Sequence, residues 1–493
     1  MKKLLYTMSL IVMTLRLYAY DADSIFIGSK ATIYSKVLNE NRKIWIYSPE
    51  ITSLAKADIK KYPVLYLLDG DAHFYSTVGI IQQLSQANGN GVLPEMIVVA
   101  IENTNRLRDL TPSLPPITSL EKANPFINFL SSELFPYVEK NFNAAPYRLL
   151  VGHSLGGLTA VDILTNFPKL FNAYIAIDPS MWYNNEKYLN NTLSQIPQKQ
   201  LNGIKLFVGT ANTMPKGMTV TQLRADKSAE TQHIRSIFKM DEFLGKNKSG
   251  LLYNQVFYKS EKHNTVPLLS IYDGLKFIFR YYLFDASEND FLDSSAMIAL
   301  KLKMHYENVT KELGYKVSAP QAFINYLGYD ALVKKQYNKA DALFKLNIEW
   351  YPNSFNVYDS YGDFLISKND TTTAITYYKK AISIKSDPMT IRKLSGLEQK
   401  SSFHLTPEEL RKYQGVYTLE TYKIDIILQM REGKLWAKVA GQPEDEFVPI
   451  SKDVFTVKGK QGYNITFKMN ADKPLHFISE QPNGVFKAVF KNE

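Results

Sequence analysis

The stretch Leu149-Leu150-Val151-Gly152-His153-Ser154-Leu155-Gly156-Gly157-Leu158 decides the fold of this 493-residue chain. It runs from an apolar segment through a serine flanked by glycines into a helical pattern that continues to Thr165. A serine on a sharp turn between a strand and a helix needs small neighbours, because no larger side chain fits beside its strained backbone. The pattern predicts a nucleophile elbow with Ser154 at its tip; an inert tight turn is the alternative.

Outward from this turn, short apolar runs alternate with helical stretches over residues 25–285. The expected strands are residues 42–47, 64–68, 96–101, 147–151, 173–177, 204–208 and 252–258. Several of them are continuous apolar runs, which is typical of strands buried on both faces. The alternation predicts an α/β domain, in which a mostly parallel sheet carries helices on both faces.

A serine hydroxyl is a weak nucleophile until a base takes its proton, and in folds of this kind the base is a histidine that follows the last strand. Of the 7 histidines, two lie between the elbow and the end of the α/β domain, His233 and His263. His263 follows the last expected strand in a polar loop, whereas His233 lies in a helical stretch. We therefore predict His263 as the general base, with His233 as the alternative.

The third member of such a site is an acid that orients the imidazole, and it is expected in the loop after residues 204–208. That loop, residues 209–214, contains no carboxylate. Asp226 is the acid that we choose, with Glu230 and Glu261 as alternatives. A Ser-His dyad without an acid is a further arrangement that the sequence leaves open.

The oxyanion of a tetrahedral intermediate is best held by backbone N–H groups that already point at it. One donor is expected to be the amide of Leu155, which follows the serine. The other is expected from the turn after residues 64–68, where Gly70 permits close approach, so that the donor is the amide of Gly70 or of Asp71. This chemistry needs neither a metal nor an organic cofactor.

Two units of equal length, residues 321–354 and 355–388, repeat within a helical segment expected at residues 290–400. The matched pairs, all at the same offset, are Gly328 with Gly362, Ala340 with Ala374, and Phe344 with Tyr378. The offset and the pattern of a small residue followed by an aromatic one resemble tetratricopeptide repeats. Because two repeats alone bury little core, we expect them to pack against residues 294–313 or against the α/β domain. They would act as a spacer or, alternatively, as a groove for a protein partner.

Residues 405–493 are expected to form a small antiparallel β domain. The strand candidates are residues 424–430, 434–439, 453–457, 463–467, 475–479 and 485–490. Turn signals separate them at residues 432–433 and 461–462, and Asn483-Gly484 is a hairpin signal.

Residues 1–19 have the pattern of a secretory signal, with two lysines, an apolar run over residues 4–15 and the small residue Ala19 at the end. The apolar run is shorter than the roughly 18 residues of a membrane helix, and no later segment reaches that length. An uncleaved amino-terminal anchor is the alternative. We expect a periplasmic or secreted protein without an integral membrane segment.

The chain contains no cysteine, which excludes a disulfide framework, a thiolate nucleophile and a thiolate zinc site. Its formal charge of +10 is spread along the sequence without a dense basic tract. Nucleic-acid binding is therefore not expected.

Four segments resemble an esterase family of α/β-hydrolases that includes siderophore, feruloyl and acetyl-xylan esterases and formylglutathione hydrolases; these segments are residues 67–71, 152–157, 178–182 and 263–267. The enterobactin-type siderophore esterases are the most similar. The resemblance implies an acyl pocket shaped by the segment after residues 173–177, which would place Trp182 and Tyr183 beside Ser154; the alternative for Trp182 is a core residue. Arg106 and Arg108 follow a strand at the edge of the sheet where ligands bind in open α/β folds, and there they could meet an anionic catecholate; solvated surface charges are the alternative.

These observations favour the hydrolysis of a small-molecule carboxylic ester through an acyl-enzyme. A siderophore trilactone is the first candidate substrate, and feruloyl or acetyl-xylan esters are the alternatives. The export signal argues against formylglutathione, whose hydrolysis is a cytoplasmic reaction. The alternative from another class is a non-catalytic scaffold, in which the repeats recruit a protein partner.

Overall fold

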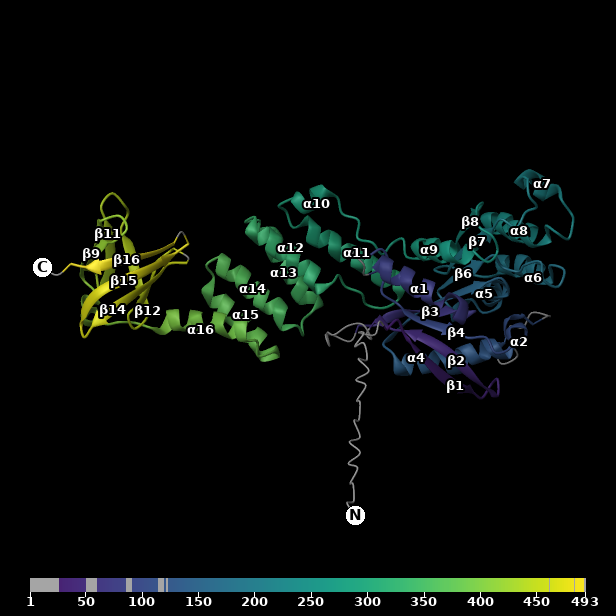
Figure 1. Cartoon of the computed structure of the whole chain (residues 1–493), viewed down its shortest axis with the longest axis horizontal. Coiled ribbons are helices and arrows are strands. Elements are labelled where there is room, and N and C mark those ends of the chain that lie inside the picture. Colours follow the sequence, from purple (N-terminus) through teal and green to yellow (C-terminus); the bar gives the residue numbers. More distant parts are fainter. Residues whose placement is uncertain are drawn as a thin grey trace, which may run out of the picture. The chain divides into compact units, whose positions relative to one another are not determined.

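The computed structural model describes residues 26–49, 60–85, 91–113, 119–120, 123–460, 462–482 and 484–491 (Figure 1). The predicted signal at residues 1–19 lies outside the described residues. Contacts divide the chain into two compact units, Met1–Ala286 with His305–Val317, and Ser287–Met304 with Ser318–Glu493. The predicted boundaries of the α/β, helical and β domains remain predictions.

An eight-stranded sheet with the order β1-β2-β4-β3-β5-β6-β7-β8 forms the centre of the first unit. Its strands are β1 (Ser29–Ser35), β2 (Glu40–Tyr47), β3 (Tyr62–Leu67), β4 (Ile97–Ile101), β5 (Ala144–His153), β6 (Ala173–Ile177), β7 (Lys205–Ala211) and β8 (Leu252–Tyr258). The pairs that involve β1 or β2 are antiparallel, and β3 to β8 are all parallel. The predicted α/β fold class is confirmed.

The register of the parallel strands brings their carboxyl ends together at one edge of the sheet. Leu67 of β3 pairs with Val151 of β5, and His153 of β5 pairs with Ile177 of β6. The turns that follow β3, β5 and β6 therefore lie side by side, although they are far apart in the sequence.

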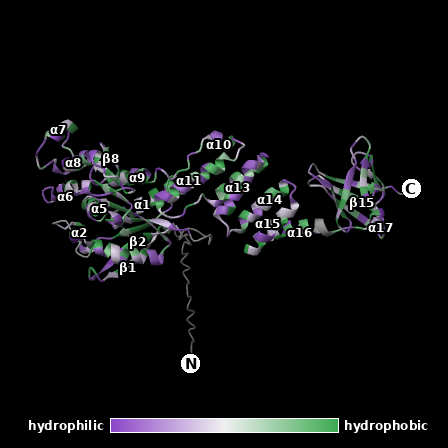
Figure 2. Ribbon diagram, turned by 180° about the vertical axis from the view of Figure 1, so that it is seen from behind, coloured by the Kyte–Doolittle hydropathy of each residue, from purple (hydrophilic) through white to green (hydrophobic). Residues whose placement is uncertain are grey.

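Helices cover both faces of this sheet (Figure 1). On one face lie α1 (Gly70–Ser85) and α9 (Val266–Ile278), and Gly274 lets α9 approach Ile175 and Phe207 closely. On the other face lie α5 (Leu155–Asn166), α6 (Lys187–Gln195) and α8 (Gln232–Lys246). Figure 2 shows hydrophobic and hydrophilic residues mixed along these helices, as expected for elements with one buried face. Among the described residues, no helix combines the length and the apolar character that crossing a membrane requires.

Shorter helical elements complete the first unit. They are α2 (Arg106–Leu110), α3 (Pro125–Phe129), the π-helical turn Leu130–Leu134, α4 (Phe135–Asn141), α7 (Val220–Ala225) and the 3₁₀ turns Pro168–Leu170 and Ile196–Gln198. The second half of α11 (Met297–Leu313) also belongs to this unit. There Glu312 pairs with the buried Lys205 of β7 at 2.9 Å, which ties the end of the helix to the sheet.

The helical part of the second unit contains two helix pairs that coincide with the two repeated units, α12 (Gln321–Val333) with α13 (Tyr337–Trp350), and α14 (Phe355–Ser367) with α15 (Thr371–Ile384). A side chain added at Gly328 would lie 2.7 Å from the ring of Phe344, and one added at Gly362 would lie 2.5 Å from the ring of Tyr378. The matched small and aromatic residues are thus the contact points of each pair. Membership of the tetratricopeptide family stays a prediction. The remaining helices of this unit are α10 (Glu288–Leu292), α16 (Pro388–Ser402) and α17 (Pro407–Arg411).

The carboxyl-terminal strands close into an antiparallel barrel with the order β10-β11-β12-β13-β14-β15-β16-β9. The strands are β9 (Gly415–Leu419), β10 (Ile424–Arg431), β11 (Lys434–Val439), β12 (Asp445–Ser451), β13 (Val454–Val457), β14 (Asn464–Asn470), β15 (Lys473–Gln481) and β16 (Gly484–Phe490). Buried aromatic side chains, among them Tyr417, Phe455 and Phe477, fill its interior, as is usual in small barrels. The predicted antiparallel β domain is confirmed.

Candidate active site

Ser154 lies on a tight turn between β5 and α5. Its φ of 58° and ψ of −114° are values that a serine rarely adopts, and strain of this kind is concentrated at functional sites. Two glycines make the turn sterically possible. A side chain added at Gly152 would lie 2.2 Å from the carbonyl oxygen of Gly156, and one added at Gly157 would lie 3.0 Å from that of Ile177.

A continuous chain of hydrogen bonds joins Ser154 to a histidine and an aspartate. Nε2 of His263 lies 3.1 Å from Oγ of Ser154. Nδ1 of the same ring lies 2.6 Å from Oδ2 of Asp178. In this arrangement the imidazole can accept the serine proton through Nε2, while the carboxylate keeps the other ring proton on Nδ1.

Asp178, which directly follows β6, is buried, and both of its carboxylate oxygens accept hydrogen bonds. Its Oδ2 also lies 2.8 Å from Nε2 of His233, and its Oδ1 accepts a hydrogen bond of 3.0 Å from the backbone N–H of Ala211. Burial alone would raise the pKa of the Asp178 carboxyl, but the hydrogen bonds from His233 and His263 lower that pKa to about 2. Asp178 is therefore ionised throughout the neutral range, and its charge can stabilise an imidazolium at His263.

Asp226, the acid predicted from the sequence, does not contact His263. Its Oδ2 accepts hydrogen bonds from the hydroxyl of Ser228, at 2.6 Å, and from the hydroxyl of Thr231. Neither Glu230 nor Glu261 bonds His263 within the described ranges of the chain. The structure thus corrects the predicted acid to Asp178, because the acid follows β6, the neighbour of the elbow strand, and not β7.

His153, next to the serine, contacts the loop that carries His263. Its Nε2 lies 2.8 Å from the backbone carbonyl oxygen of His263, so this nitrogen carries the proton and donates it. Burial lowers the pKa of His153 to about 4, with further contributions from the nearby His263 and His73. His153 is therefore neutral near pH 7, and it acts as a fixed hydrogen-bond donor to the backbone of the base.

The predicted oxyanion donors lie at the starts of the two helices that follow the neighbouring strands β3 and β5. The backbone N–H of Leu68 donates to the carbonyl oxygen of Val151 at 2.9 Å, which holds the turn after β3 against the elbow strand. Gly70 opens α1 and Leu155 opens α5, so their amides and that of Asp71 lie in first helical turns. Backbone N–H groups at such positions have no partner within the helix and are free to bind an anion.

The two arginines predicted to meet an anionic ligand are both paired with carboxylates. Arg106 forms two hydrogen bonds with Asp69, of 2.6 and 2.9 Å, and thereby fixes the turn before Gly70. Arg108 bonds Glu40 at 2.7 Å. Their charges are thus offset within the protein, a feature that the sequence pattern does not predict.

The segment after Asp178 lies against Ser154. The backbone N–H of Ser180 donates to the carbonyl oxygen of Ser154 at 3.0 Å, and the two hydroxyl oxygens lie 3.2 Å apart. Trp182, two residues later, has 40% of its surface exposed and contacts Tyr183 edge to face. Trp182 is therefore a surface aromatic close in sequence to the Ser154 contact, and not a core residue.

One cluster of the described residues has the composition of a metal site. Ligand atoms of Asp178, His233 and His263 lie within 4.8 Å of one another. Both histidines, however, already direct an N–H at the Asp178 carboxylate, and Nδ1 of His233 is buried without a partner among the described residues. A metal on Nε2 would shift the His233 proton to this buried nitrogen, where it would have no acceptor, so the arrangement favours hydrogen bonding over metal coordination.

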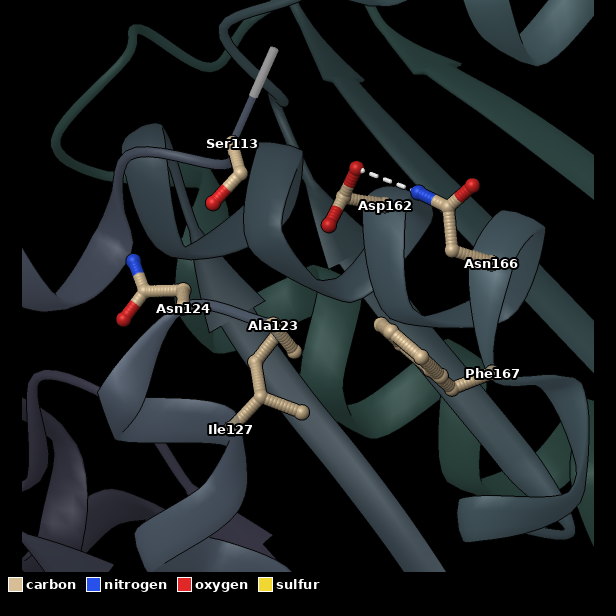
Figure 3. A pocket seen from close by; sticks show the side chains of 7 residues that line it. All are labelled: Ser113, Ala123, Asn124, Ile127, Asp162, Asn166 and Phe167. Atoms are coloured by element: carbon tan, nitrogen blue, oxygen red, sulfur yellow. Dashed lines mark hydrogen bonds between the residues drawn. The ribbon is translucent and has the colours of Figure 1, made fainter. Parts of the chain in front are cut away.

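A separate small hollow lies against the second half of α5 (Figure 3). Its lining residues are Ser113, Ala123, Asn124, Ile127, Asp162, Asn166 and Phe167. Asp162 is buried there and accepts a hydrogen bond of 2.8 Å from Asn166. Burial raises the pKa of the Asp162 carboxyl to about 7, against the opposing effect of Asn166. This carboxyl is therefore partly protonated at neutral pH.

Replacing Asp162 by Asn is expected to stabilise the first unit at alkaline pH. Because the folded-state pKa of Asp162 lies above the unfolded value, ionisation costs stability as pH rises from about 4 to about 7. The variant avoids that cost, so its advantage should reach about 2 to 4 kcal/mol at pH 8 and shrink below about 1 kcal/mol near pH 4. Thermal unfolding at both pH values measures this difference; an advantage independent of pH would contradict the assignment.

Comparison with known proteins shows what the sequence around this site is similar to. Residues 35–242 match the family described as "Putative esterase". The chain is 31% identical over 176 residues to Ferri-bacillibactin esterase BesA of Bacillus subtilis, which covers 31% of this chain and 59% of the relative. It is 29% identical over 155 residues to a siderophore triacetylfusarinine C esterase of Aspergillus fumigatus, which covers 28% of this chain and 51% of the relative.

Among solved structures, an IroE-like serine hydrolase from Shewanella oneidensis matches with a TM-score of 0.53 and 26% identity. The match covers 66% of this chain and 99% of that one. The chain thus spans between half and three fifths of the curated relatives and nearly all of this structure. Ser154, Asp178 and His233 thus lie within the residues that match the esterase family, on a sheet with an α/β-hydrolase fold.

Proposed function

We propose that this protein is a serine esterase that hydrolyses carboxylic esters through an acyl-enzyme. The observation that carries the proposal is the unbroken hydrogen-bond chain from Ser154 through His263 to Asp178. A hydroxyl on a strained turn, an imidazole within proton-transfer distance and a buried carboxylate behind it are the three parts that nucleophilic acyl transfer requires. The match of residues 35–242 to an esterase family supports the same reaction class.

The geometry supports the following sequence of steps. Oγ of Ser154 attacks the ester carbonyl carbon while Nε2 of His263 takes the serine proton, and the amides of Leu155 and of Gly70 or Asp71 bind the resulting oxyanion. Collapse of the tetrahedral intermediate breaks the ester bond, and His263 gives its proton to the departing alcohol. Water then attacks the acyl-serine with His263 as base, which releases the acid and restores the hydroxyl.

For the substrate, we propose a siderophore ester of the catecholate trilactone type. The names of two curated relatives at about 30% identity, a ferri-bacillibactin and a triacetylfusarinine C esterase, support this choice. The exposed Trp182 offers an aromatic surface on which a catechol ring could stack. Feruloyl and acetyl-xylan esters are the alternatives within the same chemistry. We also propose export to the periplasm or the medium, and a spacer role for the repeats.

A fluorophosphonate probe tests the reaction class. We expect one phosphonyl group per chain, located on Ser154 by peptide mass spectrometry, and no labelling after heat denaturation. Absence of labelling in folded protein would favour the alternative of a non-catalytic scaffold. The substrate class is tested by comparing kcat/KM for a ferric catecholate trilactone with values for feruloyl and acetyl esters under matched conditions. Faster turnover of the latter two would end the siderophore proposal.

A further inference from the structure

The acid behind His263 is shared with a second histidine. Oδ2 of Asp178 lies 2.6 Å from Nδ1 of His263 and 2.8 Å from Nε2 of His233, and the two rings meet edge to face at 5.3 Å. The exposed fraction of the side chain is 18% for His233 and 35% for His263, so His233 is the more buried of the two. A triad needs only one of these imidazoles, and the second has no role in the steps above.

The surroundings of His233 fix which of its ring nitrogens donates. Because an ionised carboxylate only accepts hydrogen bonds, Nε2 of His233 must carry a proton to bond Asp178. Its Nδ1 is buried and has no partner within the described ranges. A proton on Nδ1 would have no acceptor at this buried position, which costs free energy. His233 is therefore held as a hydrogen-bond donor to Asp178 through Nε2.

The local fold holds His233 in place. It is the second residue of α8, whose first turn follows the buried Thr231. Asp226 accepts a hydrogen bond from the hydroxyl of Thr231, and Arg235 donates to the same hydroxyl oxygen at 2.8 Å. The hydroxyl of Ser236 donates to the backbone carbonyl oxygen of His233 at 2.7 Å. Asp226, the residue predicted as the triad acid, thus stabilises the turn that positions His233.

We propose, on the basis of the proposed esterase function, that His233 is a positioning residue which orients the Asp178 carboxylate toward His263 and moderates the negative charge that His263 experiences. A second N–H on Oδ2 takes up part of that charge, so Asp178 stabilises the imidazolium of His263 less than an otherwise unshared carboxylate would. A carboxylate shared in this way leaves Nε2 of His263 better able to accept the serine proton, since it holds an added proton on the ring less strongly.

Removing the His233 donor should therefore change the pKa of His263 in a predictable direction. Without the His233 hydrogen bond, Asp178 attracts a proton at His263 more strongly, and the pKa of His263 rises. The other polar groups in contact with His263 are the Ser154 hydroxyl and the neutral His153 on its backbone carbonyl. Lys262 beside it in the chain donates through its ammonium group to the carbonyl oxygen of Asn212, and the ring of His153 lies 4.5 Å from that of His263. None of these groups is altered by a change at residue 233.

Two variants of His233 test the proposal. His233→Leu removes the donor, whereas His233→Gln places an amide N–H near the position of Nε2. In His233→Leu we expect the acidic limb of the kcat/KM profile for an aryl ester to move up by about half to one pH unit. The value of kcat/KM on the plateau should fall about tenfold to a hundredfold, the effect of losing one hydrogen bond to a charged group. His233→Gln should restore the limb to its wild-type position and most of the rate.

Titration of the His263 ring by NMR in the same variants separates this inference from the proposed function. A raised pKa of His263 in His233→Leu that His233→Gln reverses supports the inference, even if no ester is hydrolysed and the proposed function fails. An unchanged pKa in folded His233→Leu overturns it, even if the protein is an active esterase. Loss of rate in both variants without any movement of the limb would also overturn it, because a purely structural role predicts that result.

Discussion

Replacing Ser154 by Ala is expected to abolish ester hydrolysis, with kcat falling by about 10⁵- to 10⁶-fold. The variant lacks the only hydroxyl that contacts Nε2 of His263 among the described residues, so no acyl-enzyme can form. The residual rate should come from water held near the oxyanion donors. His263→Ala should cost a similar factor, because the serine and the base act as a unit. Steady-state hydrolysis of an aryl ester measures both losses.

Ser180 provides a matched control for this prediction. Its hydroxyl oxygen lies 3.2 Å from that of Ser154, so Ser180→Ala removes a hydroxyl group that is directly next to the Ser154 hydroxyl. We expect this variant to retain kcat to within about tenfold, since a neutral hydrogen bond contributes only about 1 kcal/mol. Circular dichroism should show that all three variants are folded. Retention of wild-type activity by Ser154→Ala would refute the assignment of the nucleophile.

The proximity of Ser154 and His263 could be predicted because short-range patterns specify where each lies. The bounds expected for the strands at residues 173–177 and 252–258 agree with β6 and β8, and the elbow lies where its glycines require. Parallel pairing then brings the ends of these strands to one edge. Ser154 and His263, which are 109 positions apart in the sequence, are accordingly joined by a direct hydrogen bond.

The prediction of the acid was wrong because its location depends on which strand neighbours which. An acid is expected in the loop after residues 204–208, but the register of His153 with Ile177 brings the residue after β6 beside the elbow. The signal was present, since Asp178 directly follows an apolar strand. His233 stands out in the sequence only as a rival base, because no local pattern shows that two histidines meet one carboxylate.

Three strands escaped prediction for related reasons. β1 is an edge strand with mostly exposed side chains, and only Ala31 and Ile33 give it a short apolar alternation. β12 contains two acidic residues and a proline, which interrupt its apolar pattern. β9 is short, and it closes the barrel by pairing with β16, the last strand of the chain. Closure is a long-range property that residue patterns do not encode locally.

Replacing Asp178 by Asn is expected to lower kcat about 10⁴-fold, the cost of holding the base in the wrong tautomer. The backbone N–H of Ala211 donates to Oδ1, so the amide oxygen of the new Asn should occupy that position. Its NH₂ group would then replace Oδ2 and face both His263 and His233. As a donor it would force the proton of His263 onto Nε2, where the ring can no longer accept the proton of Ser154.

Asp226→Asn is the decisive comparison, because Asp226 bonds its own loop and Asp178 bonds the base. We expect kcat of Asp226→Asn to stay within about threefold of the wild type, since its effect reaches the site only through the turn that holds His233. Rates of fluorophosphonate labelling should follow the same order, because labelling needs the activated hydroxyl but not the later steps. A large loss in Asp226→Asn with a small loss in Asp178→Asn would mean that the working enzyme uses a different acid, and that the loop between α7 and α8 moves to bring Asp226 to His263.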